Sequence, residues 1–355
     1  MTFAAEVRKA VTPRAALLVI GVLALQLLFI ASYIGALHNP KPTDVPFGVV
    51  APQQVSARLV TELDGLPGGP LDPRAVADEA TARRQILDRE IDGALIVDPR
   101  DTRDTVLVAS GGGTVLANSL TKIIKQAELS RKRTARAADV APASHQDFDG
   151  LSSFYLAVGW CVGGYLCASI LAISAGSRPA NRQRALIRTG VMALYAIAGG
   201  IGGAVIIGPV LDALPGSFWG MSGLGALTVF AVGMITLALE ALTGIVGIGL
   251  AVLLVVIAGN PSAGGAFPLP MLPDFWRAIG PALPPGASTW TARSIAYFRG
   301  NAVTGPLLVL SAWAVVGTAG TLLTAMRRKP DAEDMADAAA PPSPAPAGGA
   351  GSTPV

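Results

Sequence analysis

The residues that could carry catalysis or hold a metal are few and poorly spaced for either role. The two histidines, His38 and His145, lie far apart and outside the HExxH spacing of zinc hydrolases. The two cysteines, Cys161 and Cys167, fall six positions apart in one apolar run, on different faces of a helix. A disulfide or a thiolate metal site is therefore not expected. No GxxxxGK[ST] motif occurs, so the sequence predicts no ATPase activity, and it predicts no cofactor and no enzyme.

Glu240 is the one acid well inside the apolar part of residues 151–326. An acid within a membrane segment is by default a functional candidate. Glu240 falls, however, where the chain is expected to turn between two apolar runs. We favour a solvated turn on the cytoplasmic side over a proton or substrate site, and keep the second interpretation open.

Basic residues form the other charged pattern. Four arginines lie between residues 176 and 188 without any acid: Arg178, Arg182, Arg184 and Arg188. Such a cluster marks the cytoplasmic side of a membrane by the positive-inside rule. It could equally contact carboxylates on a partner protein, because the planar guanidinium binds them in a bidentate manner.

The composition excludes a soluble protein. Of the 355 residues, 51% are hydrophobic and only 14% are charged, whereas roughly 25% are charged in soluble domains. The net charge of +3 gives little support to nucleic-acid binding. The partner expected from these values is the lipid bilayer.

Apolar runs recur along the chain, and about 20 residues are needed to cross a bilayer. The runs cover residues 15–37, 152–175, 189–209, 219–239, 243–259 and 303–325. Basic residues precede the first run, follow the second and follow the last. We therefore predict a multi-pass protein of the cell membrane with both termini cytoplasmic and with residues 38–150 and 260–302 outside.

The predicted fold class is an α-helical integral membrane protein of six transmembrane helices, with a small extracytoplasmic α/β domain inserted between the first and second helices. The expected divisions are an N-terminus with the first helix, the extracytoplasmic domain, a five-helix domain and a disordered tail: 1–37, 38–150, 151–329 and 330–355. The tail is assigned as disordered because its alanines, prolines, glycines and serines have little apolar surface to bury.

The extracytoplasmic domain is expected to contain three strands and three helices. The strands are placed at residues 46–51, 93–98 and 105–109, and the helices at 53–66, 78–91 and around 116–127. Leu116, Leu120 and Ile124 belong to a stripe with helical spacing. The order suggests that the first two strands pair in parallel. The basic residues at 131–136 are interpreted as a solvated linker.

The segment 260–302 is too apolar for a loop in water and too rich in proline to span. It is expected to form short helices in the outer interface, where its aromatic residues are favoured. An interfacial cap with no role beyond closure is the alternative. The residues that define this outer interfacial segment are Pro261, Gly264, Gly265, Pro273, Phe275, Trp276, Pro284 and Pro285.

Glycines with GxxxG spacing occur in the second and third apolar runs. The pairs are Gly159 with Gly163 and Gly199 with Gly203. This spacing lets helix backbones approach closely. Ordinary packing within one chain is the favoured interpretation, and a dimer seam or mobile pore wall is the alternative.

Three passages together resemble the ABC-2 type permease superfamily, in its YhgE/Pip-like or DUF3533-like bacterial branch. The first is Phe47–Val50 with Gly93–Val97, and the second runs from Asp147–Ser152 into Gly159-Trp160 and Gly163–Leu166. The third is Asn260 to Pro285 followed by Arg293, and it is the most specific. The similarity covers nearly the whole chain except the tail.

The resemblance implies a six-span permease that works as a homodimer or heterodimer, exports a lipophilic or envelope-related substrate and uses an ATPase on a separate polypeptide. It places the ATPase contact in the loop from Gly176 to Arg188. It transfers no substrate-binding residue. The competing hypothesis is a non-transporting envelope protein, a receptor or secretion accessory, that acts through its outer domain.

Overall fold

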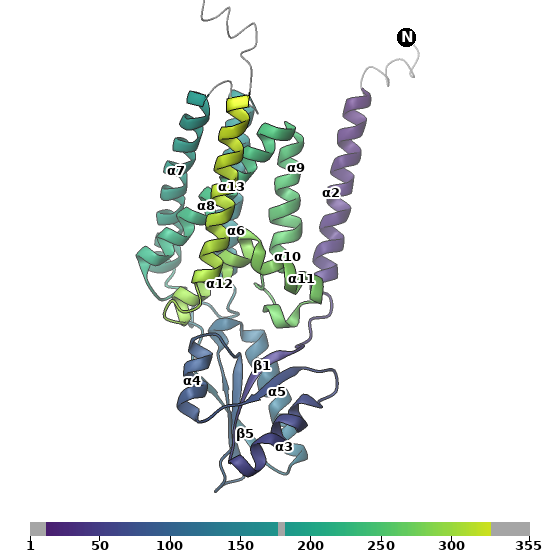
Figure 1. Ribbon diagram of the computed structural model, residues 1–355, viewed down its shortest axis with the longest axis vertical. Coiled ribbons are helices and arrows are strands. Elements are labelled where there is room, and N and C mark those ends of the chain that lie inside the picture. Colours follow the sequence, from purple (N-terminus) through teal and green to yellow (C-terminus); the bar gives the residue numbers. More distant parts are fainter. Residues whose placement is uncertain (1–11, 177–181, 328–355) are drawn as a thin grey trace, which may run out of the picture.

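The computed structural model describes residues 12–176 and 182–327, and the disordered tail expected at 330–355 lies outside them. Long helices form one part of the molecule and a five-stranded sheet with its helices forms the other (Figure 1). The sheet is inserted between the first and second long helices, the position expected for the small α/β domain. The chain has the architecture of a helical membrane protein with a small α/β domain.

Among the described residues, five helices are long and apolar enough to cross a membrane. They are α2 (Pro13–Leu37), α6 (Ser152–Ala175), α7 (Arg182–Val205), which continues into the π-helix η2 (Ile206–Val210), α8 (Phe218–Thr243) and α13 (Thr304–Arg327). The run expected at 243–259 forms a shorter helix at Val246–Ser262, composed of α9 (Val246–Val252), the π-helix η3 (Leu253–Gly259) and α10 (Asn260–Ser262). The described residues thus include five helices of sufficient length to span a membrane and one shorter apolar helix.

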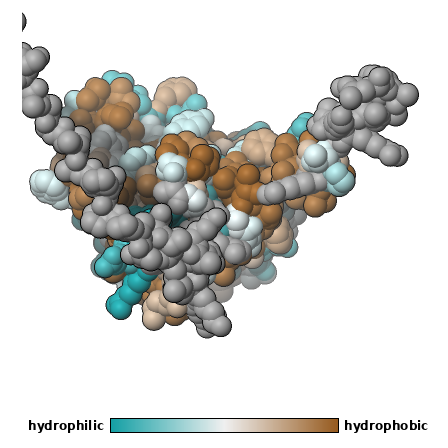
Figure 2. All heavy atoms as spheres, turned by 90° about the horizontal axis from the view of Figure 1, so that it is seen from above, coloured by the Kyte–Doolittle hydropathy of each residue, from teal (hydrophilic) through white to brown (hydrophobic). Residues whose placement is uncertain are grey.

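The long helices turn large apolar side chains outward. Leu17 on α2, Ile173 on α6 and Leu194 on α7 are each more than two-thirds exposed, at 71%, 77% and 71%. Apolar residues gather over the visible surface of the helices when the molecule is viewed from above (Figure 2). In water this surface would be costly, since each square ångström of exposed apolar area costs about 25 cal/mol. A lipid environment removes the cost.

Helix α8 forms the centre of the helical part, with α6, α7 and α13 packed around it. Glycines allow the closest approaches. A Cβ on Gly200 of α7 would overlap the backbone of Ser222 and Ala226 on α8, and one on Gly317 of α13 would overlap the backbone at Ile235. These helices therefore pack backbone to backbone.

The sheet has the order β2-β1-β3-β4-β5. Its strands are β1 (Val45–Val50), β2 (Leu71–Ala75), β3 (Gly93–Ile96), β4 (Arg103–Val108) and β5 (Thr134–Asp139). Strand β1 pairs in parallel with β2 and with β3, which confirms the parallel pairing expected for the strands near residues 46 and 93. Strand β4 runs antiparallel to β3 and parallel to β5.

Three helices cover the sheet: α3 (Gln53–Asp64), α4 (Glu79–Leu87) and α5 (Thr114–Ser130). Phe47, Leu120 and Ile124 are fully buried on one side, so the apolar stripe expected near 116–127 faces the core. A second cluster that includes Ile86 and Leu107 closes the other side. Helix α4 ends at Leu87, earlier than the expected residue 91.

The interpretation of residues 131–136 as a solvated linker is wrong. Residues 134–139 form edge strand β5, and Arg133 reaches inward to buried Asp104, with its Nε and Nη2 each 2.6 Å from a carboxylate oxygen. Arg131 donates to buried Glu128 at 2.7 Å. The arginines are positioned here because two buried acids require opposite charges.

This acid pair predicts a pH-dependent stability of the sheet. Burial, and then the neighbouring Asp104, raise the pKa of Glu128 from 4.5 to about 7. The folded state therefore binds more protons than the unfolded state between these values, and stability falls as the pH rises from about 4.5 to about 7. We expect faster hydrogen exchange in β4 and β5 at pH 8 than at pH 5.5, after correction for the intrinsic exchange rate.

The variant Glu128→Gln should lose most of this pH dependence, because its side chain stays neutral throughout. Glu79→Gln, on the exposed surface of α4, is the matched control and should keep it. Equal pH dependence in Glu128→Gln and the unmodified protein would contradict the role assigned to this carboxyl group.

The outer interfacial segment forms short helices, as expected. They are the 3-10 helices η4 (Leu269–Met271) and η5 (Gly280–Ala282) and the α-helices α11 (Asp274–Ile279) and α12 (Pro284–Tyr297). Prolines lie at the starts of η4, η5 and α12, where a missing backbone N–H costs nothing. The segment lies between the long helices and the sheet domain (Figure 1).

Candidate functional site

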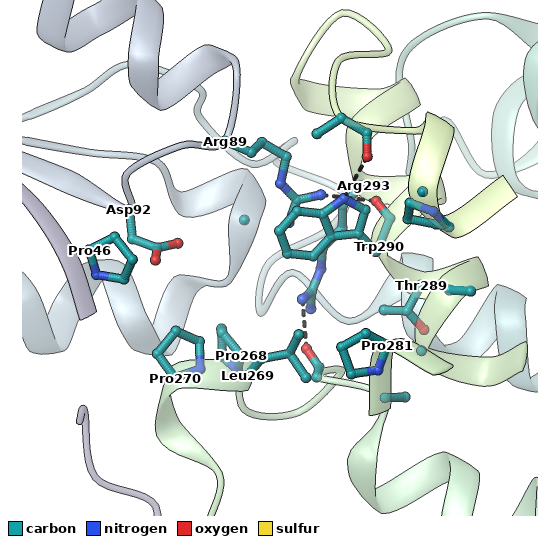
Figure 3. A pocket seen from close by; sticks show the side chains of 18 of the residues that line it. Pro46, Arg89, Asp92, Pro268, Leu269, Pro270, Pro281, Thr289, Trp290 and Arg293 are labelled. Carbon is teal, nitrogen blue, oxygen red and sulfur yellow. Dashed lines mark hydrogen bonds between the residues drawn. The ribbon is translucent and has the colours of Figure 1, made fainter. Parts of the chain in front are cut away.

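A cavity of about 570 Å³ lies where the sheet domain meets the outer interfacial segment (Figure 3). The sheet domain supplies Pro46, Arg89 and Asp92, and α12 supplies Thr289, Trp290 and Arg293. The remaining lining residues come mainly from the outer segment and from the start of α13: Glu90, Gly112, Ala263, Gly264, Pro268, Leu269, Pro270, Pro281, Gly286, Ala287, Ala302, Thr304, Gly305 and Pro306. The walls are thus mostly apolar, with a few charged groups.

Arg89 follows the end of α4 and holds a left-handed backbone, with φ of 59°. Its guanidinium carbon lies 3.3 Å from the centroid of the Trp290 ring and 4.7 Å from that of Phe298. Nη1 also donates to the Trp290 carbonyl at 3.0 Å and to Ser294 Oγ at 2.9 Å. Cation–π contact and hydrogen bonds together fix the guanidinium at the cavity wall.

Arg293 is buried and joins three separate backbone segments. Nη1 donates to the carbonyl of Gly264 at 2.7 Å, and Nη2 donates to those of Gly265 at 2.8 Å and Gly150 at 3.1 Å. Burial lowers the pKa of Arg293 to about 10, so it is charged at neutral pH. The carbonyls of Gly264 and Gly265, two of the residues expected to matter in the outer segment, are thus its acceptors.

Asp147 provides the opposite charge near Arg293. The Tyr297 hydroxyl donates to Asp147 Oδ2 at 2.7 Å, and the backbone N–H of Ser152 donates to Oδ1 at 2.8 Å. Burial, followed by the bond to Asp147, raises the pKa of Tyr297 above its usual value. The passages around residues 147–152 and 260–293, which both carried the family resemblance, therefore meet in one buried network.

Asp92 is one of the two acids that line the cavity, the other being Glu90. Burial raises the pKa of Asp92 to about 6, and the charge of Arg89 opposes that shift. Burial also lowers the pKa of Arg89 to about 9, with the charge of Arg293 acting in the same direction. At pH 7.5 Asp92 is therefore mostly ionised and both arginines are charged. These three groups together carry one positive charge, and Glu90, the other acid of the lining, lies 3.9 Å from Arg74.

Hydrogen bonds hold the sheet domain against the outer segment. Asn301 Nδ2 donates to the Leu87 carbonyl at 3.1 Å and to Asp88 Oδ1 at 2.8 Å. On the other side, the backbone N–H of Thr43 donates to the Pro270 carbonyl at 2.9 Å. The cavity thus has walls from two parts of the chain that are fixed to one another.

The residues that define the outer interfacial segment fall into a buried group and an exposed group. The buried ones are Pro261, Gly264, Gly265, Pro284 and Pro285, while Pro273 and Phe275 are exposed and Trp276 is partly exposed. Phe275 and Trp276 contact each other edge to face. Of the buried members, Gly264 lines the cavity, and the aromatic pair lies on the surface.

The arginine cluster does not form one loop. Arg178 lies outside the described residues, while Arg182 and Arg184 are exposed in the first turn of α7. The expectation that Arg188 is a surface contact is wrong: Arg188 is buried, and its Nη2 donates to the Gly176 carbonyl at 2.7 Å. The helix begins earlier than the expected residue 189, and this carries Arg188 inside.

The solvated turn favoured for Glu240 is also wrong. Helix α8 continues to Thr243 and turns at Gly244, whose φ is 69°, so Glu240 stays inside the helix and is fully buried. Its carboxylate lies beside Ser169 on α6 and interacts with the charge of Arg188 on α7. Two buried groups of opposite charge, on α7 and α8, thus lie close enough to interact near the end opposite the sheet.

The four glycines of the GxxxG pairs differ in what lies next to them in the structure. A Cβ on Gly203 would overlap the Trp160 indole, and one on Gly163 would lie 3.1 Å from the Tyr195 hydroxyl. Gly199 lies against the Val229 side chain, and Gly159 has open space. Gly163 and Gly203 therefore serve packing within the chain.

Sequence reasoning missed Arg89 and Asp92 as site residues. They follow a short helix in the sheet domain, and no motif surrounds them. Their significance depends on Trp290 and Arg293, about two hundred residues later. Charged residues beside a helix end are common, so the pattern carried no signal. Among the described residues, no group of three or more His, Cys, Asp or Glu side chains could hold a metal ion.

Comparison with known proteins gives no relative for this chain. No family model, no curated protein and no solved structure matches it.

Proposed function

We propose that the chain is a permease-like protein of the cell membrane that exports a lipophilic or envelope-related substrate with a separate ATPase, as a homodimer or heterodimer. In this proposal six helices cross the bilayer, both termini are cytoplasmic and the sheet domain is outside. The observation that carries it is the cavity at the junction of the sheet domain and the membrane part. Such a site, mostly apolar with a few charged groups, is typical of small-molecule binding.

The arrangement of basic residues supports the orientation. The beginning of α2, the beginning of α7 and the end of α13 lie at the same end of the helices, away from the sheet (Figure 1). Basic residues lie at or near each of these points. This arrangement supports an orientation in which that end of the helices faces the cytoplasm, according to the positive-inside rule.

The sixth crossing is proposed for the short helix at Val246–Ser262. Seventeen residues in α-helical geometry extend roughly 25 Å, against roughly 30 Å for the hydrocarbon core. The helix runs beside the longer ones in Figure 1 and leads into the outer segment. With this sixth crossing, the outer interfacial segment and the sheet domain lie on the same side of the membrane in the proposal.

The test is co-purification of an ABC-type ATPase from membranes of the source cells. Arg182 and Arg184, exposed at the start of α7, are both changed to lysine, which keeps the charge and removes the bidentate geometry. We expect the ATPase yield to fall about tenfold, because a lost charged contact costs about 1.5–3 kcal/mol. Arg299→Lys, beyond α12, is the matched control and should leave the yield unchanged.

Cysteine labelling in the same preparations checks the topology. In a background without Cys161 and Cys167, a cysteine replacing Ser130 should react with an impermeant reagent in intact cells, and one replacing Gln183 should not. Failure of any ABC-type ATPase to co-purify with the unmodified protein would favour the non-transporting envelope protein instead. Labelling of the Gln183→Cys variant from outside would overturn the orientation.

A further inference from the structure

The cavity at the domain junction has room for an organic group and not only for an ion. Its volume of about 570 Å³ falls within the range of about 300–1,000 Å³ typical of small-molecule sites. Pro268, Leu269, Pro270 and Pro281 form an apolar part of the wall (Figure 3). A ligand that fills it therefore brings apolar surface as well as any charge.

Arg89 retains hydrogen-bonding capacity at this wall. Nη1 donates to Trp290 and Ser294, but within the described chain Nε and Nη2 have no acceptor, and no acid lies within ion-pair distance of the guanidinium. The guanidinium is already oriented by the Trp290 ring, so binding an anion would cost little side-chain entropy. The two remaining donors suit an oxyanion.

The charged residues of the lining indicate whether the ligand is an anion or a cation. Arg89 and Arg293 both line the cavity, and Asp92 is the acid that faces them. Glu90 also contributes to the lining, and its carboxylate lies 3.9 Å from Arg74, which offsets its charge. Asp147 likewise offsets the charge of Arg293, which leaves Arg89 and Asp92 as the charges that a ligand would meet. An anion would gain the two donors of Arg89 that have no acceptor, whereas a cation would gain one carboxylate. The balance favours an anion.

We propose that the cavity binds the anionic head of an amphiphile, a phosphate or carboxylate against Arg89, with the adjoining organic part against the proline-lined wall. The neighbouring α11 has the edge-to-face pair Phe275 and Trp276 on its surface, as expected beside lipid headgroups. This inference rests on the proposed function and names the class of molecule that such a permease would handle.

The test is calorimetric titration of the purified full-length protein in a neutral maltoside detergent at pH 7.5. The probes are dihexanoyl phosphatidylglycerol, dihexanoyl phosphatidylcholine and inorganic phosphate, each below any micelle-forming concentration. We expect the anionic lipid to bind at least about tenfold more tightly than either other probe, because only it combines a net charge with an apolar body.

Two variants with opposite expected effects identify the site. Arg89→Gln should weaken binding of the anionic lipid about tenfold, because it removes the charged donors. Asp92→Asn should strengthen binding about threefold, because it removes the opposing charge. Arg58→Gln, on the exposed surface of α3, is the matched control and should leave affinity unchanged.

Each outcome decides the inference. Equal binding of the two lipids, or unchanged affinity in a folded Arg89→Gln variant, would overturn it. Equal affinity for inorganic phosphate would replace the amphiphile by a free anion. If Arg89→Gln does not fold, Asp92→Asn decides alone: tighter binding supports the site and unchanged binding overturns it. Lost lipid binding with intact ATPase co-purification would remove this inference and leave the proposed function standing.

Discussion

Replacing Arg293 by methionine is expected to destabilise the protein by about 3–5 kcal/mol, the cost of removing one partner from a buried charged network. The guanidinium holds the carbonyls of Gly150, Gly264 and Gly265, and its removal leaves buried Asp147 without the nearby positive charge. The melting temperature of the detergent-solubilised protein should fall by many degrees, with a lower yield from membranes.

Two further substitutions make the result specific. Arg293→Lys keeps the charge but cannot reach three carbonyls, so an intermediate loss is expected. Arg299→Met changes an exposed arginine beyond the same helix and should leave the free energy of unfolding within about 0.5 kcal/mol of that of the unmodified protein. Similar melting temperatures for Arg293→Met and Arg299→Met would refute the role of the network.

Gly200 and Gly202 lie two positions apart on α7, and we expect their replacement by alanine to change the free energy of unfolding in opposite directions. Gly200→Ala places a methyl group into the backbone of Ser222 and Ala226, which cannot move aside, and should cost about 2–3 kcal/mol. Gly202→Ala meets nothing within 4 Å and should stabilise the helix by up to about 1 kcal/mol through helix propensity. Thermal unfolding followed by intrinsic fluorescence measures both.

The comparison separates packing within the chain from helix propensity, because both substitutions add the same atoms to the same helix. Stabilisation by both alanines would mean that α7 and α8 are not in backbone contact. Destabilisation by Gly202→Ala would instead reveal a partner on that face, which would support a dimer seam on α7.

Much of the fold could be predicted where apolar periodicity is strong. Strands β1 and β3 are short apolar runs that are buried almost throughout, and α5 repeats buried residues at helical spacing, so local sequence was sufficient. Strands β2 and β5 were missed. The first contains Pro73 and the second consists mainly of alanine and charged residues, and both are edge strands, where proline and charge are tolerated.

The site was harder to predict, because it depends on distant contacts. Local pattern placed Arg188 in a loop and Glu240 in a turn, since charges at the ends of apolar runs usually face water. In the folded chain α7 and α8 extend by several residues, and the two opposite charges are buried close enough to interact. Burial of Arg188 and Glu240 is energetically possible because the packing of the helices brings each charge near the opposite one.

The contacts between Arg89 and Trp290 and between Asn301 and Asp88 also set an order of assembly. They join residues separated by 201 and 213 positions in the chain. The last strand of the sheet ends at Asp139, so the domain can be completed during synthesis well before its docking surface exists. Docking must await the synthesis of α12 and the residues after it. A ribosome that stops before residue 290 would release a folded sheet domain with no Trp290 ring to cover Arg89.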